Sequence, residues 1–221
     1  MLDNNVRYLQ LAFNYDNALV ARILPRIRLN ERILIEAGTP FLKREGMGGI
    51  RTMRALWKGH IVADLKIADG AVGEVEMARA AGATAITALG SSPTETLDLF
   101  VNHCANLGML SMIDMIGVTD PLAVVRPLKR PPNVVILHRG RDEESTRGKM
   151  IQYRHINRLR SKYDVFIAAA GGIDLKEARS AVFNGAGLVV VNLVQPGDDW
   201  VGIPTNSNVP GVVEQYLATL A

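Results

Sequence analysis

The sequence has little cysteine, few aromatic residues and almost no excess charge. Its 221 residues include one cysteine, Cys104, so no disulfide can form within the chain. With no signal peptide at the start, this favours a reducing, cytoplasmic environment. Aromatic residues make up 5% and the formal net charge is +3, which argues against nucleic-acid binding through stacking or charge. No apolar run approaches the roughly 20 residues needed to span a bilayer, so we expect no membrane partner.

Predicted strands and helices alternate along the whole chain. Strands are expected at residues 8–14, 32–36, 61–66, 83–89, 109–115, 133–138, 164–169 and 188–192. Strands joined through helices must be parallel, and their near-continuous apolar character indicates burial on both faces. Eight such units predict an α/β fold, a single (β/α)8 TIM barrel domain over residues 1–221. A doubly wound open sheet is the alternative, but its glycine-rich dinucleotide turn is absent after the first strand.

Two predicted loops are unusually long for such a compact domain. One covers residues 139–149, after the sixth strand, and the other covers residues 193–208, after the eighth. Long loops in compact domains are more often functional than decorative. Whether the second loop closes over a ligand is left open by the sequence.

The third predicted strand carries the most unusual pattern. Because side chains alternate between the two faces of a strand, Val62, Asp64 and Lys66 share one face. Asp69 follows where the chain is expected to turn into a helix. One interpretation is a structural salt bridge at a strand end. The other is a polar site at the carboxyl end of a barrel strand.

Other strand ends are polar as well, and in a TIM barrel these ends meet at the active-site face. The candidates are Asn14, Glu36, Asp64, Lys66, Asp69, Asp114, His138, Arg139, Arg141, Gly171 and Gly172. Each has a structural alternative, such as a turn cap for Asp114 or a buried structural histidine for His138. A purely structural barrel would not gather so many charges at one rim, because each is costly to remove from water. The coincidence therefore predicts a functional site.

The residue types suggest a chemistry. Glu36 and Asp64, on neighbouring strands, are oxygen donors suited to a Mg²⁺ ion that takes its remaining ligands from water and substrate. Such an ion can stabilise an enediolate, and Lys66 can hydrogen-bond the same developing oxyanion. His138 has a pKa range suited to proton transfer near neutrality. These residues predict an enediolate reaction.

The same rim offers groups for an anion. Gly171 and Gly172 precede a predicted helix, where backbone N–H groups can face a phosphate. Arg139 and Arg141 follow the sixth strand and could reach the same anion or a substrate hydroxyl. Together with the metal donors, they predict a phosphorylated sugar substrate.

Four motifs resemble the hexulose-6-phosphate synthase and 3-keto-L-gulonate-6-phosphate decarboxylase family, within the orotidine-monophosphate decarboxylase suprafamily. The motifs are Asp64-x-Lys66-x-x-Asp69, Leu9-Gln10-Leu11-Ala12, Glu36-Ala37-Gly38-Thr39-Pro40 and Ala170-Gly171-Gly172-Ile173. The resemblance covers almost the whole chain. True orotidine-monophosphate decarboxylases carry a lysine at the end of strand two, where this chain has Glu36, which argues against pyrimidine synthesis.

The resemblance implies a lyase in which Glu36 and Asp64 hold Mg²⁺, Lys66 stabilises the enediolate and His138 acts as an acid or base. It also implies a homodimer in which Asp69 reaches into the site of the neighbouring subunit. The synthases add formaldehyde reversibly to ribulose 5-phosphate. The decarboxylases reach an equivalent enediolate by losing CO₂.

Three features bear on how far the resemblance extends. Asn14 replaces an aspartate that contacts substrate at the end of strand one, and an amide cannot take up a proton as a carboxylate does. Asn192 and Leu193 replace a Gly-Arg or Gly-Ser pair that binds phosphate, so a non-standard substrate is open. Arg141 matches an arginine that helps catalysis in the decarboxylases.

We therefore expect an aldehyde-lyase of the 3-hexulose-6-phosphate synthase type. A decarboxylase is the first alternative, and a divergent barrel that binds a phosphorylated ligand without turnover is the second. The residues expected to act in catalysis are Asp64, Lys66, Asp69, His138 and Arg141. Those expected to contact substrate are Asn14, Glu36, Asp114, Gly171, Gly172 and Asn192.

Overall fold

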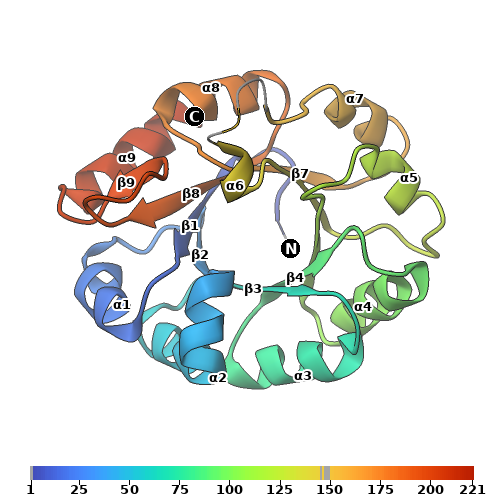
Figure 1. The fold of residues 1–221 in the computed structure, drawn as a ribbon, viewed down its shortest axis with the longest axis horizontal. Coiled ribbons are helices and arrows are strands. Elements are labelled where there is room, and N and C mark those ends of the chain that lie inside the picture. Colours follow the sequence, from blue (N-terminus) through green and yellow to red (C-terminus); the bar gives the residue numbers. More distant parts are fainter. Residues whose placement is uncertain (1, 145, 147–149) are drawn as a thin grey trace.

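The computed structural model describes residues 2–144, 146 and 150–221. Within these residues, eight parallel strands pair in chain order, and the eighth pairs back to the first to close a barrel. Figure 1 looks down this barrel, with the helices forming a ring outside it. The predicted TIM barrel is confirmed, and the closing β1–β8 pairing excludes the open sheet.

The strands lie within a residue or two of their predicted positions. They are β1 Tyr8–Phe13, β2 Ile33–Ala37, β3 Ile61–Ile67, β4 Ala85–Leu89, β5 Leu110–Asp114, β6 Val134–His138, β7 Phe166–Ala170 and β8 Leu188–Val194. Most of their residues are buried, as parallel strands covered on both faces require.

The helices between them begin and end at local signals. They are α1 Asn17–Ile23, α2 Thr39–Leu56, α3 Ala71–Ala81, α4 Thr94–Asn106, α5 Pro121–Val125, α6 Arg141–Glu144, α7 His155–Arg160, α8 Leu175–Phe183 and α9 Val209–Thr219, with a 3₁₀ turn at Leu24–Arg26. Asp16 and Asp174 cap α1 and α8 by accepting hydrogen bonds from backbone N–H groups. Gly82 ends α3 in the left-handed conformation that glycine adopts without strain.

The two segments expected to be loops contain regular structure, so that expectation was wrong in part. Residues 139–149 include α6, although positions 145 and 147–149 lie outside the described residues. Residues 193–208 include the end of β8 and a short strand, β9 Gly202–Pro204, which pairs in parallel with β8. The strand β9 has three residues, which is too short to show an alternation of polar and apolar side chains. The strand β8 continues two residues beyond the polar Asn192, where it was expected to end.

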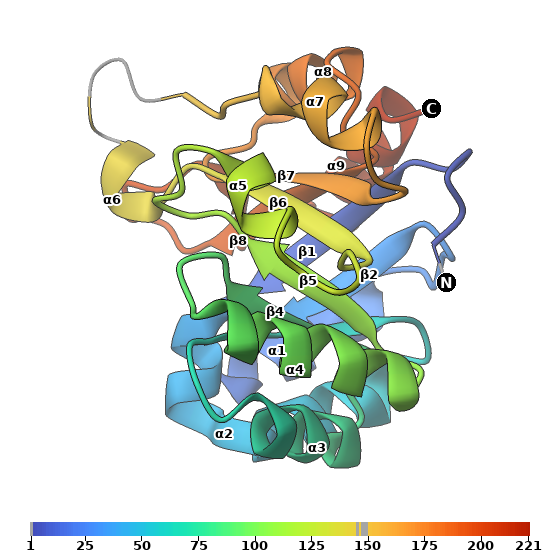
Figure 2. The ribbon, with the colours of Figure 1, turned by 90° about the vertical axis from the view of Figure 1, so that its right-hand side faces the viewer.

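The barrel interior is apolar below its carboxyl mouth, where Val62, Met112, Ile136 and Ala168 belong to one buried cluster. A larger cluster fills the space between strands and helices and includes Cys104, whose pKa is raised by burial to about 12. Figure 2 shows the barrel from the side, with α6 at the carboxyl end of the strands. Among the described helices, none is both long and apolar enough to cross a membrane. This apolar filling leaves the carboxyl mouth as the place where polar side chains converge.

Candidate active site

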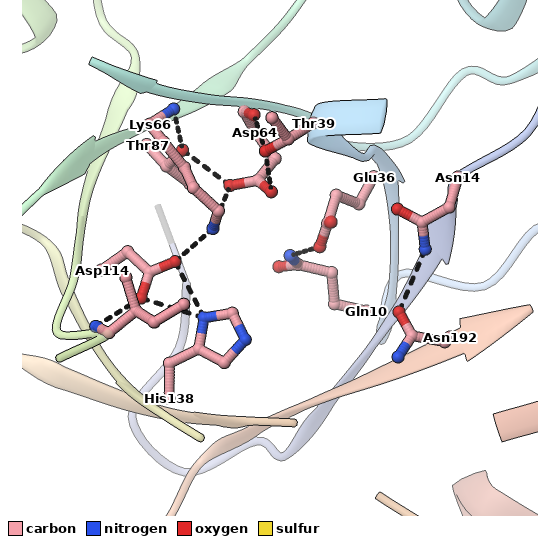
Figure 3. Close-up of polar contacts among 11 residues, drawn as sticks. Gln10, Asn14, Glu36, Thr39, Asp64, Lys66, Thr87, Asp114, His138 and Asn192 are labelled. Atoms are coloured by element: carbon pink, nitrogen blue, oxygen red, sulfur yellow. Dashed lines mark hydrogen bonds and ion pairs between the residues drawn. The ribbon is translucent and has the colours of Figure 1, made fainter. Parts of the chain in front are cut away.

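A cavity of about 290 Å³ lies at the carboxyl ends of the strands. Its walls include Gln10, Asn14, Glu36, Thr39, Asp64, Lys66, Thr87, Asp114, His138, Arg141, Glu144, Gly171 and Asn192. Figure 3 shows most of these polar side chains pointing toward a common centre from different strands. The structure therefore brings most of the candidate residues together around one cavity.

Asp64 is fixed by hydroxyl groups on both of its carboxylate oxygens. Thr39 Oγ1 donates to Asp64 Oδ2 at 2.8 Å, and Thr87 Oγ1 donates to Asp64 Oδ1 at 2.8 Å. Asp64 is 8% exposed. These bonds hold the carboxylate in one orientation at the cavity wall and leave lone pairs on both oxygens for further ligands.

Lys66 lies between two carboxylates. Its Nζ is 3.1 Å from Asp64 Oδ1 and also forms an ion pair with Asp114 Oδ2. Burial opposes the charged ammonium, but the two carboxylates outweigh burial and raise the pKa of Lys66. The lysine is therefore held as a cation, ready to stabilise negative charge on a bound molecule.

The backbone at Lys66 is also unusual, because it is a non-glycine residue with φ of +51°. The pairing of β3 with β4 is irregular between Ala63 and Ile67, and the Lys66 N–H donates to Thr87 Oγ1 at 3.0 Å. Such a conformation costs about 1–3 kcal/mol and persists where the surroundings enforce it. The bulge places the ammonium beside Asp64, so the predicted salt bridge exists, but within the wall of a cavity.

Asp114 extends the charged chain to His138. Its carboxylate accepts from His138 Nδ1 at 2.9–3.0 Å and from the Ile116 N–H at 3.0 Å. Burial would raise the pKa of Asp114, but His138 and Lys66 hold it well below its usual range. Burial would likewise lower the pKa of His138, but Asp114 raises it above the ordinary value. Because Nδ1 faces Asp114, the Nε2 edge of His138 is left to exchange a proton with a bound molecule.

Glu36 lies across the cavity mouth from His138 (Figure 3), and no ion pair joins it to a cationic side chain among the described residues. Its Oε2 accepts a hydrogen bond from Gln10 Nε2. Burial, and then the negative charge of Asp64, raise the pKa of Glu36 to about 7. A buried carboxylate repelled by a neighbouring one is stabilised by a cation placed between them.

The donor set fits a Mg²⁺ ion. Glu36 and Asp64 supply carboxylates with free lone pairs on neighbouring strands. Across the described parts of the chain, no group of three or more His, Cys, Asp or Glu side chains could hold a metal. Mg²⁺ commonly binds through one or two carboxylates and completes its shell with water and substrate oxygens, so two protein ligands suit it.

The two positions that depart from the family pattern contact one another. Asn14 Nδ2 donates to Asn192 Oδ1 at 3.1 Å, joining the end of β1 to β8. Gly38 makes room for this pair, because a Cβ there would lie 2.1 Å from Asn14 Oδ1. Each of the two amides therefore has a neutral hydrogen-bond partner in the other.

Arg141, on α6, is held at the cavity mouth by stacking. Its guanidinium carbon lies 3.3 Å from the centroid of the Trp200 ring, and Trp200 stacks on Tyr15 with centroids 6.1 Å apart. The Tyr15 hydroxyl donates to Asp198, and burial and this bond raise the pKa of Tyr15 to about 12. The β8–β9 connection thus positions Arg141, although the sequence did not single out Tyr15 or Trp200.

Gly171 is required by its surroundings. Its φ is +101°, and a Cβ there would lie 1.9 Å from the backbone oxygen of Arg139. We expect Gly171→Ala to lower the free energy of unfolding by about 2–4 kcal/mol, because both the backbone angle and the contact oppose a side chain. Urea denaturation followed by circular dichroism measures this change.

The matched control is Gly48→Ala. Gly48 lies in α2, is exposed, and a Cβ there would meet nothing within 4 Å. We expect this change to leave stability equal or to raise it by about 0.5–1 kcal/mol. Equal stability of the two variants would show that the turn after β7 tolerates a side chain.

Not every candidate lies in the cavity. Asp69 is exposed beyond β3, and Gly172 follows Gly171 without contributing to the cavity wall. The role of Asp69 in a neighbouring subunit, and the homodimer itself, stay predictions. Sequence reasoning missed Thr39 and Thr87, which orient Asp64, and gave no role to Gln10. A polar residue in the apolar run of β1 was the available signal for Gln10.

The chain matches known proteins over most of its length. Residues 7–192 match the model of the orotidine 5'-phosphate decarboxylase / HUMPS family. A bifunctional enzyme Fae/Hps from Methanothrix thermoacetophila is 35% identical over 215 residues, covering 96% of this chain and 52% of that protein. The Fae/Hps enzyme from Methanosarcina barkeri is 33% identical with the same coverage. The chain thus spans about half the length of these curated relatives.

Solved structures agree with these sequence matches. A 3-hexulose-6-phosphate synthase from Salmonella typhimurium has 27% identity and a TM-score of 0.83, with 96% of this chain and 98% of that chain covered. A 3-keto-L-gulonate-6-phosphate decarboxylase from Vibrio cholerae shares the fold, with 18% identity, a TM-score of 0.73 and 97% of each chain covered. The chain belongs to the orotidine 5'-phosphate decarboxylase / HUMPS family.

Proposed function

We propose that the protein is a Mg²⁺-dependent aldehyde-lyase that adds formaldehyde reversibly to ribulose 5-phosphate, the reaction expected of a 3-hexulose-6-phosphate synthase, the name of a similar solved structure. The arrangement that carries the proposal is Lys66, held as a cation at 3.1 Å from Asp64 and close to the uncompensated carboxylate of Glu36. Glu36 and Asp64 would hold Mg²⁺, which supplies Lewis acidity toward oxygens of the substrate. An enediolate bears its charge on such oxygens, so the site matches that intermediate.

The chain's own residues account for the proton and charge movements. The neutral form of His138 takes a proton from carbon 1 of the sugar, and the electron pair left behind forms the enediolate. Lys66 donates a hydrogen bond to the developing oxyanion. Carbon 1 then bonds to the carbonyl carbon of formaldehyde, whose oxygen receives the proton from the His138 imidazolium. The reverse sequence breaks the same bond and releases formaldehyde.

The first experiment measures formaldehyde by a colorimetric assay. Purified protein with ribulose 5-phosphate and Mg²⁺ is expected to consume formaldehyde, and EDTA is expected to abolish the loss, because Glu36 and Asp64 alone leave the enediolate charge without its metal. Added excess Mg²⁺ should restore the rate. Consumption that persists unchanged in EDTA would contradict a metal-dependent reaction.

A second candidate is the decarboxylase reaction, favoured by the place of Arg141 in the cavity wall. Its test is CO₂ release from 3-keto-L-gulonate 6-phosphate under the same conditions. Turnover of this substrate but not of ribulose 5-phosphate and formaldehyde would replace the first proposal. Absence of both reactions would favour the third reading, a barrel that binds a phosphorylated ligand without turnover. The Asn14–Asn192 pair is the structural feature that supports this reading.

A further inference from the structure

The turn after β7 forms a corner beside the cavity, where side chains of opposite charge cover the backbone. A Cβ on Gly172 would lie 2.3 Å from Arg139 Nη2 and 3.0 Å from Glu144 Oε2. A guanidinium and a carboxylate therefore both lie directly over this glycine. Arg139 Nη2 also donates to the carbonyl oxygen of Gly171 at 3.1 Å, which keeps the guanidinium in the corner.

Glu144 is unusual in this corner because it places a carboxylate oxygen in a buried position without a hydrogen-bond partner among the described residues. It comes from α6 and reaches the cavity wall, and the oxygen without a partner is Oε2. Burial raises the pKa of Glu144, while the Val201 N–H and the charges of Arg139 and Arg141 favour its ionised form. An unpaired buried acceptor costs about 1–3 kcal/mol, so the carboxylate is incompletely satisfied where it lies.

We propose that the Glu144 carboxylate is an internal anion that fills the phosphate position beside Gly171 and Gly172, and that it leaves this position when a phosphorylated ligand binds. This inference rests on the proposed function for the nature of the ligand. Glu144 is thereby a specificity-determining residue, because a ligand can bind in the corner only if its interactions there are stronger than those of the Glu144 carboxylate.

The energetics of the exchange favour a dianion. A carboxylate brings one negative charge to the corner, whereas a phosphate monoester brings close to two and more acceptor oxygens. On leaving, Glu144 gives up the Val201 N–H, but its Oε2, which has no partner among the described residues, gains hydration. A singly charged or neutral ligand end gains less from Arg139 and does not displace Glu144. The corner therefore selects phosphorylated sugars over their unphosphorylated forms.

The test uses inorganic phosphate as the probe, titrated into the whole protein by calorimetry. Glu144→Gln is expected to bind phosphate about tenfold more tightly than the natural protein, because a neutral amide neither competes for the corner nor repels the dianion. Glu144→Ala, which empties the position, is expected to change affinity in the same direction. The KM for ribulose 5-phosphate is expected to fall with it.

The matched control is Glu95→Gln, the same replacement at an exposed position on α4 that does not line the cavity. Its phosphate affinity is expected to change less than about twofold, since general charge effects are screened at the surface. Equal gains in Glu95→Gln and Glu144→Gln would overturn the proposal, as would unchanged affinity in both Glu144 variants. Phosphate binding needs no turnover, so loss of the aldol reaction alone would defeat the proposed function and leave this inference standing.

Discussion

We expect replacement of Lys66 with methionine to lower kcat for formaldehyde consumption by about a thousandfold, the scale of loss when a donor to a developing oxyanion is removed. The ammonium is held between Asp64 and Asp114, whose charges raise its pKa despite burial. Methionine keeps much of the length of the side chain but can neither donate a hydrogen bond nor carry charge. Binding of substrate through its phosphate is retained, so kcat falls far more than KM rises.

The same substitution also destabilises the fold. Without Lys66, two buried carboxylates lose their shared cation, and removal of one partner from such a network costs about 3 kcal/mol. Assays are therefore made well below the midpoint of thermal unfolding, with circular dichroism confirming the folded state. Turnover within about tenfold of the natural protein, in a folded Lys66→Met variant, would remove Lys66 from the proposed chemistry.

Lys176→Met is the matched control for this change. Lys176 is exposed on α8, far along the chain from the charged cluster. The same side-chain replacement there is expected to leave both kcat and stability unchanged, because an exposed lysine contributes little. A similar loss in both variants would mean that methionine acts through solubility or aggregation.

The barrel was predictable because its signals are local. Each strand is a short apolar run, and α3 ends at a residue that stops helices, Gly82 with its φ of +104°. Parallel strands then bring Glu36, Asp64 and His138 to one rim, whatever the details of packing. For this reason the sequence located the main charged residues of the site without any knowledge of distances.

The rest of the site depends on contacts that no local pattern encodes. Asn14 and Asn192 are 178 positions apart and meet only because β8 pairs with β1. Thr87 reaches Asp64 across an irregular stretch of β3 and β4, and that irregularity accompanies the positive φ of Lys66. Alternation placed Lys66 on the correct face, but it could not show the bulge that brings its ammonium onto Asp114.

The second large effect is expected from Asp114→Asn, which removes the carboxylate shared by Lys66 and His138. The Asp114 side chain is 1% exposed, and its loss leaves His138 without its carboxylate partner and Lys66 with Asp64 alone. We expect a loss of about 3 kcal/mol in the free energy of unfolding near neutral pH. We also expect kcat to fall by at least about a hundredfold, because Lys66 and His138 lose their orientation.

The pKa of His138 determines how the stability of the natural protein and of Asp114→Asn changes with pH. In the natural protein the folded-state pKa of His138 lies above its unfolded value near 6.5, because Asp114 outweighs the effect of burial. Its stabilising contribution is fully present below pH 6.5 and is lost as the pH rises through the folded-state pKa. In Asp114→Asn, burial remains and the carboxylate is gone, so the pKa of His138 falls below 6.5. The stability contribution of this group then decreases as the pH is lowered through 6.5.

Two measurements decide the outcome. Imidazole NMR titration follows the pKa of His138 directly, and thermal unfolding between pH 5 and pH 8 follows its contribution to stability. His138→Gln, alone and combined with Asp114→Asn, assigns the pH-dependent part to His138 through a double-mutant cycle, because His60, His103 and His155 remain unchanged in every variant. If the pKa of His138 stays above 6.5 in Asp114→Asn, then another group holds its proton. In that case Asp114 would not be the group that determines the protonation of His138.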